Sequence, residues 1–134
     1  MKKNYYENRM KRCFFSIIGD CEPNEIIEKL SLTPDAVLRP GDMHPYEGVR
    51  VERYEIIVGY NDLYHKDYNE MLYKTLGPLV AKEELFTELK EKYSLTYKVN
   101  VGREMEGELF ILDGPLASFI ARTGSTADQS FNFF

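Results

Sequence analysis

Residues 13–18 read CFFSII and residues 19–30 read GDCEPNEIIEKL, and together these two stretches decide the architecture of the chain. The first is aromatic and β-branched and is bounded by Gly19, which is typical of a strand buried on both faces. The second favours a helix, because Pro23 suits the first helical position and Glu25 suits the positive end of the helix dipole. We therefore expect a buried central strand that leads into a short helix.

The segment that follows predicts a loop and then a bent strand. The short helix is expected to end before Pro34, because a residue that precedes proline is forced out of helical geometry. Residues 35–48 contain several prolines and glycines, which predicts a loop. Residues 49–60, VRVERYEIIVGY, alternate as a strand does, but the apolar phase slips near Glu52-Arg53. A bulge or bend is expected at that slip.

The rest of the chain predicts three helices and three strands. In chain order these are a helix capped by Asn61-Asp62 and stopped or kinked at Gly77-Pro78, a helix from about Lys82 to Tyr93, a strand over 95–101, a strand over 108–112, a short helix opened by Pro115, and a closing strand that contains Phe131 and Phe133. The complete order is therefore β-α-β-α-α-β-β-α-β.

This order predicts an α+β fold with a single mixed or mostly antiparallel sheet of about five strands and helices on one face. A doubly wound parallel sheet is disfavoured, because the glycine-rich phosphate-binding signatures of that fold do not occur. A length of 134 residues suits one domain with one hydrophobic core. We therefore expect residues 1–134 to form a single domain, with residues 1–11 as a flexible basic arm.

The stretch IIGDCEPNEIIEKLSLTP (17–34), the tripeptide Arg39-Pro40-Gly41 and the strand RVERYEIIV (50–58) carry a family resemblance. They resemble the bacterial domain-of-unknown-function family 4279, which opens with a strand, Gly-Asp, an acidic residue before proline and a short helix. The resemblance covers nearly the whole chain. It implies an architecture and no established activity, although small bacterial domains of this kind can accompany toxin genes as immunity proteins.

The composition narrows the class of function. A net charge of −5 argues against general nucleic-acid binding, which requires a basic surface. The apolar runs are far shorter than the roughly 20 residues that cross a bilayer, and the basic N-terminus lacks the apolar region of a signal peptide. We therefore expect a cytoplasmic protein without membrane contact, whose acidic surface suits a basic protein partner.

Side chains that usually carry chemistry are few in this sequence. The two cysteines, Cys13 and Cys21, do not make a disulfide framework, and Cys13 is expected to be a buried apolar residue. The two histidines, His44 and His65, fall short of the ligands that a zinc site needs, and both are expected at the surface. No serine follows the pattern of a nucleophile elbow. We predict no catalytic set, no metal and no cofactor.

The leading hypothesis is a non-enzymatic protein-binding domain of the immunity or antitoxin type that neutralises a basic toxin. Glu104, Glu106 and Glu108 alternate, so they project from one face of a continuous strand, or form a solvated hairpin tip if Gly107 makes a turn. Three tyrosines at four-residue spacing predict one face of the helix near Asp62, either as an interface or packed on the sheet. They are Tyr60, Tyr64 and Tyr68.

Two alternatives remain open. The first is a small-ligand-binding or enzymatic domain whose site lies between the sheet and the 35–48 loop. Its candidate residues are Arg39, His44, Arg50 and Arg53. The second is a homo-oligomer that forms by strand pairing at the closing edge, where Phe131, Phe133 and Phe134 lie. The oligomeric state is not determined by the sequence.

Overall fold

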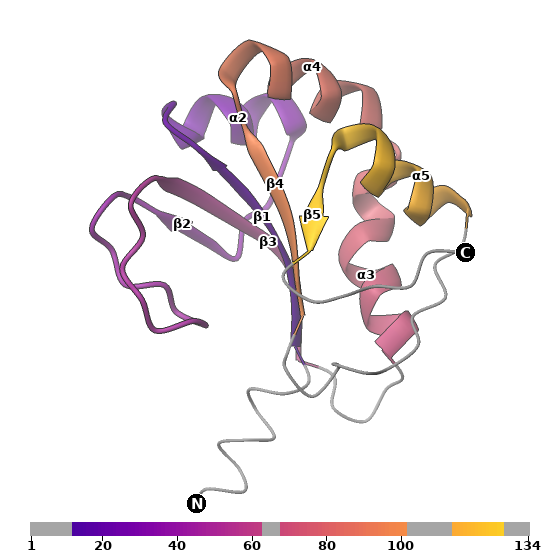
Figure 1. The fold of residues 1–134 in the computed structure, drawn as a ribbon, viewed down its shortest axis with the longest axis horizontal. Helices are drawn as coiled ribbons and strands as arrows, with labels where there is room; N and C mark the ends of the chain where they lie inside the picture. Colours follow the sequence, from indigo (N-terminus) through magenta and orange to yellow (C-terminus); the bar gives the residue numbers. More distant parts are fainter. Residues whose placement is uncertain (1–11, 63–67, 102–113, 128–134) are drawn as a thin grey trace, which may run out of the picture.

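The computed structural model describes residues 12–62, 68–101 and 114–127, and all statements about the structure concern these residues (Figure 1). Their elements are, in chain order, β1 (Arg12–Gly19), α2 (Pro23–Leu30), β2 (Ala36–Leu38), β3 (Tyr54–Asp62), α3 (Tyr68–Val80), α4 (Glu83–Tyr93), β4 (Thr96–Val101), α5 (Gly114–Thr123) and β5 (Thr126–Ala127). The predicted basic arm, the predicted strand over 108–112 and the closing phenylalanines lie outside the described residues.

The five described strands form one sheet with the order β2-β3-β1-β4-β5. The strand pairs are antiparallel except for β4 and β5, which run parallel. In Figure 1, α3 and α5 lie on one side of the sheet, and the connection between β2 and β3 lies on the other. The predicted α+β class, with a mixed sheet of about five strands and helices on one face, is confirmed.

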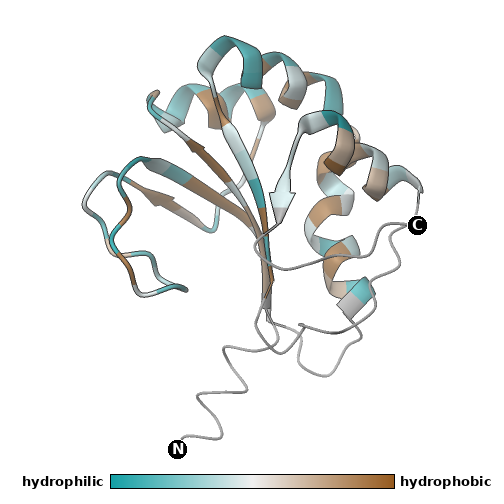
Figure 2. Ribbon diagram, viewed as in Figure 1, coloured by the Kyte–Doolittle hydropathy of each residue, from teal (hydrophilic) through white to brown (hydrophobic). Residues whose placement is uncertain are grey.

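The central strand β1 is buried on both faces, as its composition predicts. Cys13, Phe15 and Ile17 point into the main core beneath the helices, whereas Phe14 belongs to a second, smaller core on the opposite face. Figure 2 shows apolar residues concentrated along the central strands, with polar residues on the outer surface of the helices. One strand therefore serves two different layers, because successive side chains of a strand point to opposite faces.

The main core is organised around aromatic rings. Phe86 from α4 meets Phe15 and Tyr97 edge to face, at centroid distances of 5.7 and 5.1 Å. The hydroxyl of Tyr97 donates to the carbonyl of Phe86 at 2.5 Å, which satisfies its only buried polar group. Phe119 from α5 adds a further edge-to-face contact with Phe86 at 5.3 Å. These contacts tie α4, α5 and the sheet into one packed unit.

Two lysines from the α4 region stabilise the ends of neighbouring helices. The ammonium of Lys82 donates to the carbonyls of Leu30 and Ser31 at 2.5 and 3.3 Å, where α2 ends. The ammonium of Lys90 donates to the carbonyls of Thr123 and Gly124 at 3.0 and 3.1 Å, where α5 ends. The last carbonyls of a helix lack intrahelical partners and carry negative partial charge, so a cation is favourable there.

The strand predicted over residues 49–60 both begins and ends later in the structure than expected. The strand β3 begins at Tyr54, directly after the expected bend, and continues through Asn61 and Asp62. These two residues therefore do not cap the following helix, and that part of the prediction was wrong. Gly59, at a φ of 69°, marks a bulge where β3 changes register against β1. A Cβ at this position would lie 2.9 Å from the carbonyl oxygen of Thr75 in α3.

Three other boundaries differ from expectation. The helix α2 ends at Leu30, before the predicted stop, because Ser31 adopts a left-handed conformation at a φ of 52°. The predicted loop over 35–48 contains β2, which pairs with β3 and buries Leu38. Pro78 lies inside the last turn of α3 and does not stop it. Proline removes one helical hydrogen bond, and the burial of Leu79 in the main core holds this turn in place.

Candidate functional site

The connection between β2 and β3, residues 39–53, folds back over the second face of the sheet, and we refer to it as the lid. Its hydrogen bonds close a small hairpin, from the amide of Gly41 to the carbonyl of Val51 at 2.8 Å and from the amide of His44 to the carbonyl of Val49 at 2.7 Å. Met43 and Arg50 pair between these bonds. The lid is therefore a structured element and not an open loop.

Beneath the lid lies a group of buried polar side chains, which we call the polar centre. It consists of Ser16 from β1, Glu55 from β3, Asn100 from β4 and His44 from the lid. The strand register explains how the three sheet residues meet. Ile18 pairs with Glu55, and Phe14 pairs with Asn100, so all of these side chains share the face of Ser16.

The polar centre is a continuous chain of hydrogen bonds. The amide of Asn100 donates to the hydroxyl of Ser16 at 3.0 Å, and that hydroxyl donates to the Glu55 carboxylate at 2.7 Å. The Nε2 atom of His44 lies 3.1 Å from the same carboxylate oxygen. Among the described residues, no buried side-chain nitrogen or oxygen lacks a partner. The chain is therefore internally satisfied, as buried polar groups must be if they are not to destabilise the fold.

Backbone amides determine which nitrogen of His44 carries the hydrogen. The amides of Tyr46 and Glu47 both point at Nδ1, each at 3.2 Å, so Nδ1 accepts and Nε2 must be the N–H that donates to Glu55. In this arrangement Nε2 is unavailable as a general base or as a metal ligand, because both roles require its lone pair. Within residues 12–62, 68–101 and 114–127, no group of three His, Cys, Asp or Glu side chains suits a metal ion.

The carboxylate of Glu55 is ionised in this environment. Burial by itself would raise the pKa of Glu55, but hydrogen bonds from His44 and Ser16, with the positive charge of Lys98 nearby, outweigh burial and lower that pKa below its ordinary value of 4.5. A buried carboxylate without these partners would destabilise the fold. The polar centre is therefore built around one negative charge.

The order of contacts differs from that of a hydrolytic triad. In a triad the histidine accepts from the serine and the carboxylate orients the histidine. Here the carboxylate of Glu55 lies between Ser16 and His44, and the serine donates to the carboxylate instead. Ser16 is fully buried on the face of the sheet that the lid covers. The geometry thus positions the lid and does not activate a nucleophile.

The burial of His44 corrects the sequence-based expectation that this histidine lies at the surface. Its side chain is 1% exposed, and its ring packs 5.6 Å from the ring of Phe14. The prediction was wrong because the residues around His44 are polar or turn-forming, whereas the partner that buries it comes from β3. Polar residues inside otherwise apolar strands carried a usable signal: Ser16 in CFFSII, Glu55 in YEIIV and Asn100 in VNV. The other histidine, His65, lies outside the described residues.

The three arginines proposed for a ligand site do not converge with His44. Arg39 pairs with Glu22 at 3.3 Å, and Arg53 pairs with Asp20 at 3.0 Å, both on the connection that leads into α2. Arg50 donates to a carbonyl within the lid, that of Gly41, at 2.8 Å. All three guanidinium groups therefore fasten the lid, at its two ends and across its hairpin, and His44 fastens its centre.

The residues proposed for partner binding are only partly described. Glu104, Glu106 and Glu108 lie outside the described residues, as does Tyr64. Tyr60 lies in β3 and Tyr68 is the first residue of α3, so a shared helix face for these tyrosines is wrong. Instead, the ring of Tyr60 stacks on Tyr46 of the lid at 4.3 Å.

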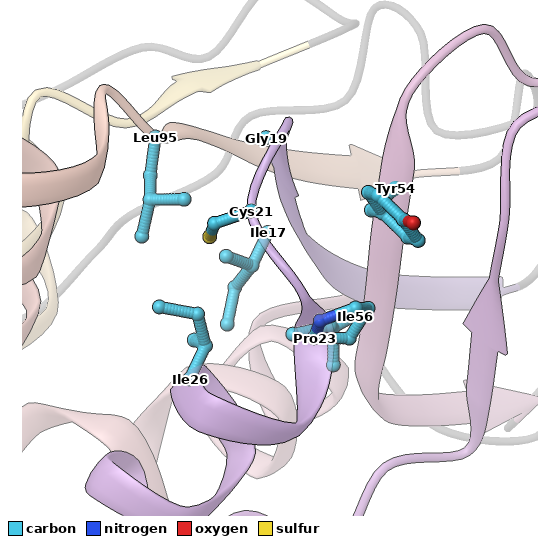
Figure 3. A pocket seen from close by; sticks show the side chains of 8 residues that line it. All are labelled: Ile17, Gly19, Cys21, Pro23, Ile26, Tyr54, Ile56 and Leu95. Atoms are coloured by element: carbon cyan, nitrogen blue, oxygen red, sulfur yellow. The ribbon is translucent and has the colours of Figure 1, made fainter.

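A small pocket lies at the end of the sheet where β1 leads into α2 (Figure 3). Its volume is about 10 Å³, which is room for one water molecule. Apart from Gly19, Cys21 and Tyr54, its lining consists of apolar side chains, and all of these except Pro23 belong to the main core. Burial raises the pKa of Cys21, with the neighbouring acidic residues adding to the effect, so this thiol is a weak nucleophile. The pocket therefore does not have the size or the chemistry of a substrate site.

A larger, open groove of about 470 Å³ runs between α4 and α5. Its walls carry Glu83, Glu84, Thr87 and Glu88 from α4 and Arg122 from α5. Arg122 is paired with Glu83 at 3.5 Å. The remaining two carboxylates, Glu84 and Glu88, are exposed, lie one helical turn apart, and have no ion pair within the described residues. The groove therefore presents net negative charge to solvent.

These features define a small α+β domain with one sheet, a helical layer on one face and a fastened lid on the other. The chain belongs to the family described as "Domain of unknown function (DUF4279)", whose model matches residues 8–127. This membership confirms the resemblance found in the sequence. No curated protein and no solved structure matches the chain. In the part of the chain that the structure describes, no helix has the length and apolar character to cross a bilayer.

Proposed function

We propose that the protein is a non-enzymatic protein-binding domain that acts in the cytoplasm as an immunity or antitoxin-type protein and neutralises a basic toxin. The observation that carries the proposal is the acidic groove between α4 and α5. An open groove whose carboxylates lack ion pairs within the described part of the chain attracts a partner of opposite charge and steers its approach. The net charge of −5 on the whole chain adds to this attraction for a basic partner.

The state of the polar centre supports a binding role over a catalytic one. Every potential acid, base or nucleophile in it is engaged by a partner inside the protein. The alternative based on Arg39, His44, Arg50 and Arg53 is less favoured, because the arginines make contacts that fasten the lid. A ligand pocket formed by all four would require those contacts to break.

The test uses two charge-reversed variants with the same net charge. Glu84→Lys with Glu88→Lys changes the groove, whereas Glu28→Lys with Glu91→Lys changes exposed positions on α2 and α4 that do not line it. The binding partner in the assay is the purified product of the adjacent gene, and affinity is measured by calorimetry at two salt concentrations. We expect the groove variant to bind at least about tenfold more weakly, because like charges then face each other, and the matched control to bind almost normally.

Equal losses in both variants would show that only overall charge matters, and unchanged binding by the groove variant would refute the groove as the contact. The triple variant of Glu104, Glu106 and Glu108 to Lys tests the second acidic surface that the sequence predicts. A loss confined to the triple variant would assign the contact to that surface instead of the groove.

A further inference from the structure

The lid is a separable unit, because its backbone hydrogen bonds are internal. Five amides of the lid, those of Gly41, Asp42, His44, Gly48 and Val51, donate to carbonyls of the lid itself. The ion pairs at its two ends are largely exposed, and exposed ion pairs contribute little to stability. A segment with these properties can open locally while the sheet stays folded.

Two neighbouring side chains, His44 and Tyr46, hold the middle of this unit against the sheet. Among residues 39–53, only His44 is fully buried, whereas Tyr46, Val51 and Arg53 are partly exposed and the others are exposed. The His44 ring lies beside the ring of Phe14 and donates its Nε2 hydrogen to Glu55. The ring of Tyr46 packs on Phe14 at 5.1 Å and on Tyr60 at 4.3 Å. His44 thus supplies the buried polar attachment of the lid, and it combines an aromatic contact with one N–H donor.

The His44 ring rests on a surface that the sheet provides, and we call this surface the floor. It consists of Phe14 and Ser16 from β1, Glu55 from β3 and Asn100 from β4. Ser16 and Asn100 hold the Glu55 carboxylate in place through bonds that do not involve the lid, at 2.7 and 3.0 Å. The floor therefore keeps its shape when the lid opens, as a preformed binding site does.

We propose that His44 is an internal ligand of this floor, and that a small planar heterocycle with an N–H donor takes the place of His44 when the lid opens. The floor supplies an aromatic face and an ionised acceptor, which together select a flat ring that donates a hydrogen bond. Displacement breaks the contacts that His44 and Tyr46 make with the sheet, whereas the contacts within the sheet remain. The inference does not depend on the acidic groove.

Chemical rescue tests this proposal directly. His44→Gly removes the internal ligand and leaves a space of the same shape above the floor. The probe is free imidazole at pH 8, and the readout is hydrogen exchange of the lid amides of Gly41, Gly48 and Val51. We expect these amides to exchange at least about tenfold faster in His44→Gly than in the wild type, because their anchor is gone. Millimolar imidazole should restore most of the lost protection.

Two controls separate recognition from space filling. N-methylimidazole has no N–H group, and the double variant His44→Gly with Glu55→Gln lacks the ionised acceptor, so neither combination should show rescue. Rescue that is equal with N-methylimidazole, or equal in the double variant, would overturn the proposal, as would the absence of any effect of imidazole on His44→Gly. If His44→Gly does not fold in buffer, the folded fraction is measured against imidazole concentration. Recovery of folding then supports the site, and failure to recover overturns it.

Discussion

The two faces of the sheet are covered in different ways. On one face the helices bury an apolar core in which Phe15, Phe86, Tyr97 and Phe119 interlock. On the other face the lid covers a small apolar cluster and the polar centre, and it contributes one fully buried side chain. The difference teaches that the helical face supplies most of the stability, whereas the lid face supplies a local unit that can move.

The largest expected effect comes from two adjacent phenylalanines. Phe15 and Phe14 are 0% and 1% exposed, but they point to the helical face and the lid face respectively. Phe15→Ala should lower the free energy of unfolding by about 3–5 kcal/mol, because a rigid core cannot close the cavity. Phe14→Ala should cost roughly half as much, because the lid can settle into the space. Urea denaturation measures both, and equal losses would contradict the comparison.

A pair of glycines gives the next largest effect. Gly59 and Gly48 have positive φ angles of 69° and 70°, but only Gly59 faces a close neighbour, the carbonyl of Thr75. Gly59→Ala should destabilise the protein by about 2–3 kcal/mol, since strain and a clash combine, and Gly48→Ala by about 1 kcal/mol, since strain acts alone. Thermal unfolding measures the difference. A Gly48→Ala variant as unstable as Gly59→Ala would mean that the lid is coupled rigidly to the core.

The polar centre should make the free energy of unfolding depend on pH in the acidic range. The pKa of Glu55 is lowered on folding, so its ionised form contributes stability above the ordinary value of 4.5, and this contribution is lost as the pH falls through the lower value in the folded protein. Glu55→Gln should therefore weaken the pH dependence of the free energy of unfolding below pH 4.5, by up to about 1.4 kcal/mol per pH unit. An unchanged acid profile in Glu55→Gln would contradict the assignment.

A smaller effect is expected where α4 supports α5. Lys90→Met removes the cation that caps the last carbonyls of α5 and should cost about 1 kcal/mol. Lys92→Met, in which an exposed lysine on the same helix is changed, serves as the matched control and should change stability by about 0.5 kcal/mol or less. Chemical denaturation of both variants measures the difference, and equal effects would mean that the cap is unimportant.

The sequence predicted what local patterns determine. The central strand, the helix after Pro23 and the strand over 95–101 were found because periodicity and helix-starting residues lie within each segment. The strand β2 was missed because three residues acquire strand geometry only by pairing with β3. The role of His44 was missed for the same reason. Its partner Glu55 is eleven positions away and belongs to a strand whose facing direction depends on the whole sheet.

The central claim is that the lid is a separate cooperative unit, and native-state hydrogen exchange of the wild-type protein tests it most directly. The amides of His44 and Val51 in the lid are compared with those of the central strand β1 at increasing, sub-denaturing concentrations of urea. The account predicts that the lid amides exchange faster, with almost no dependence on urea, because they open locally. Equal rates and an equal dependence on urea for lid and β1 amides would contradict it, because both would then open only by global unfolding.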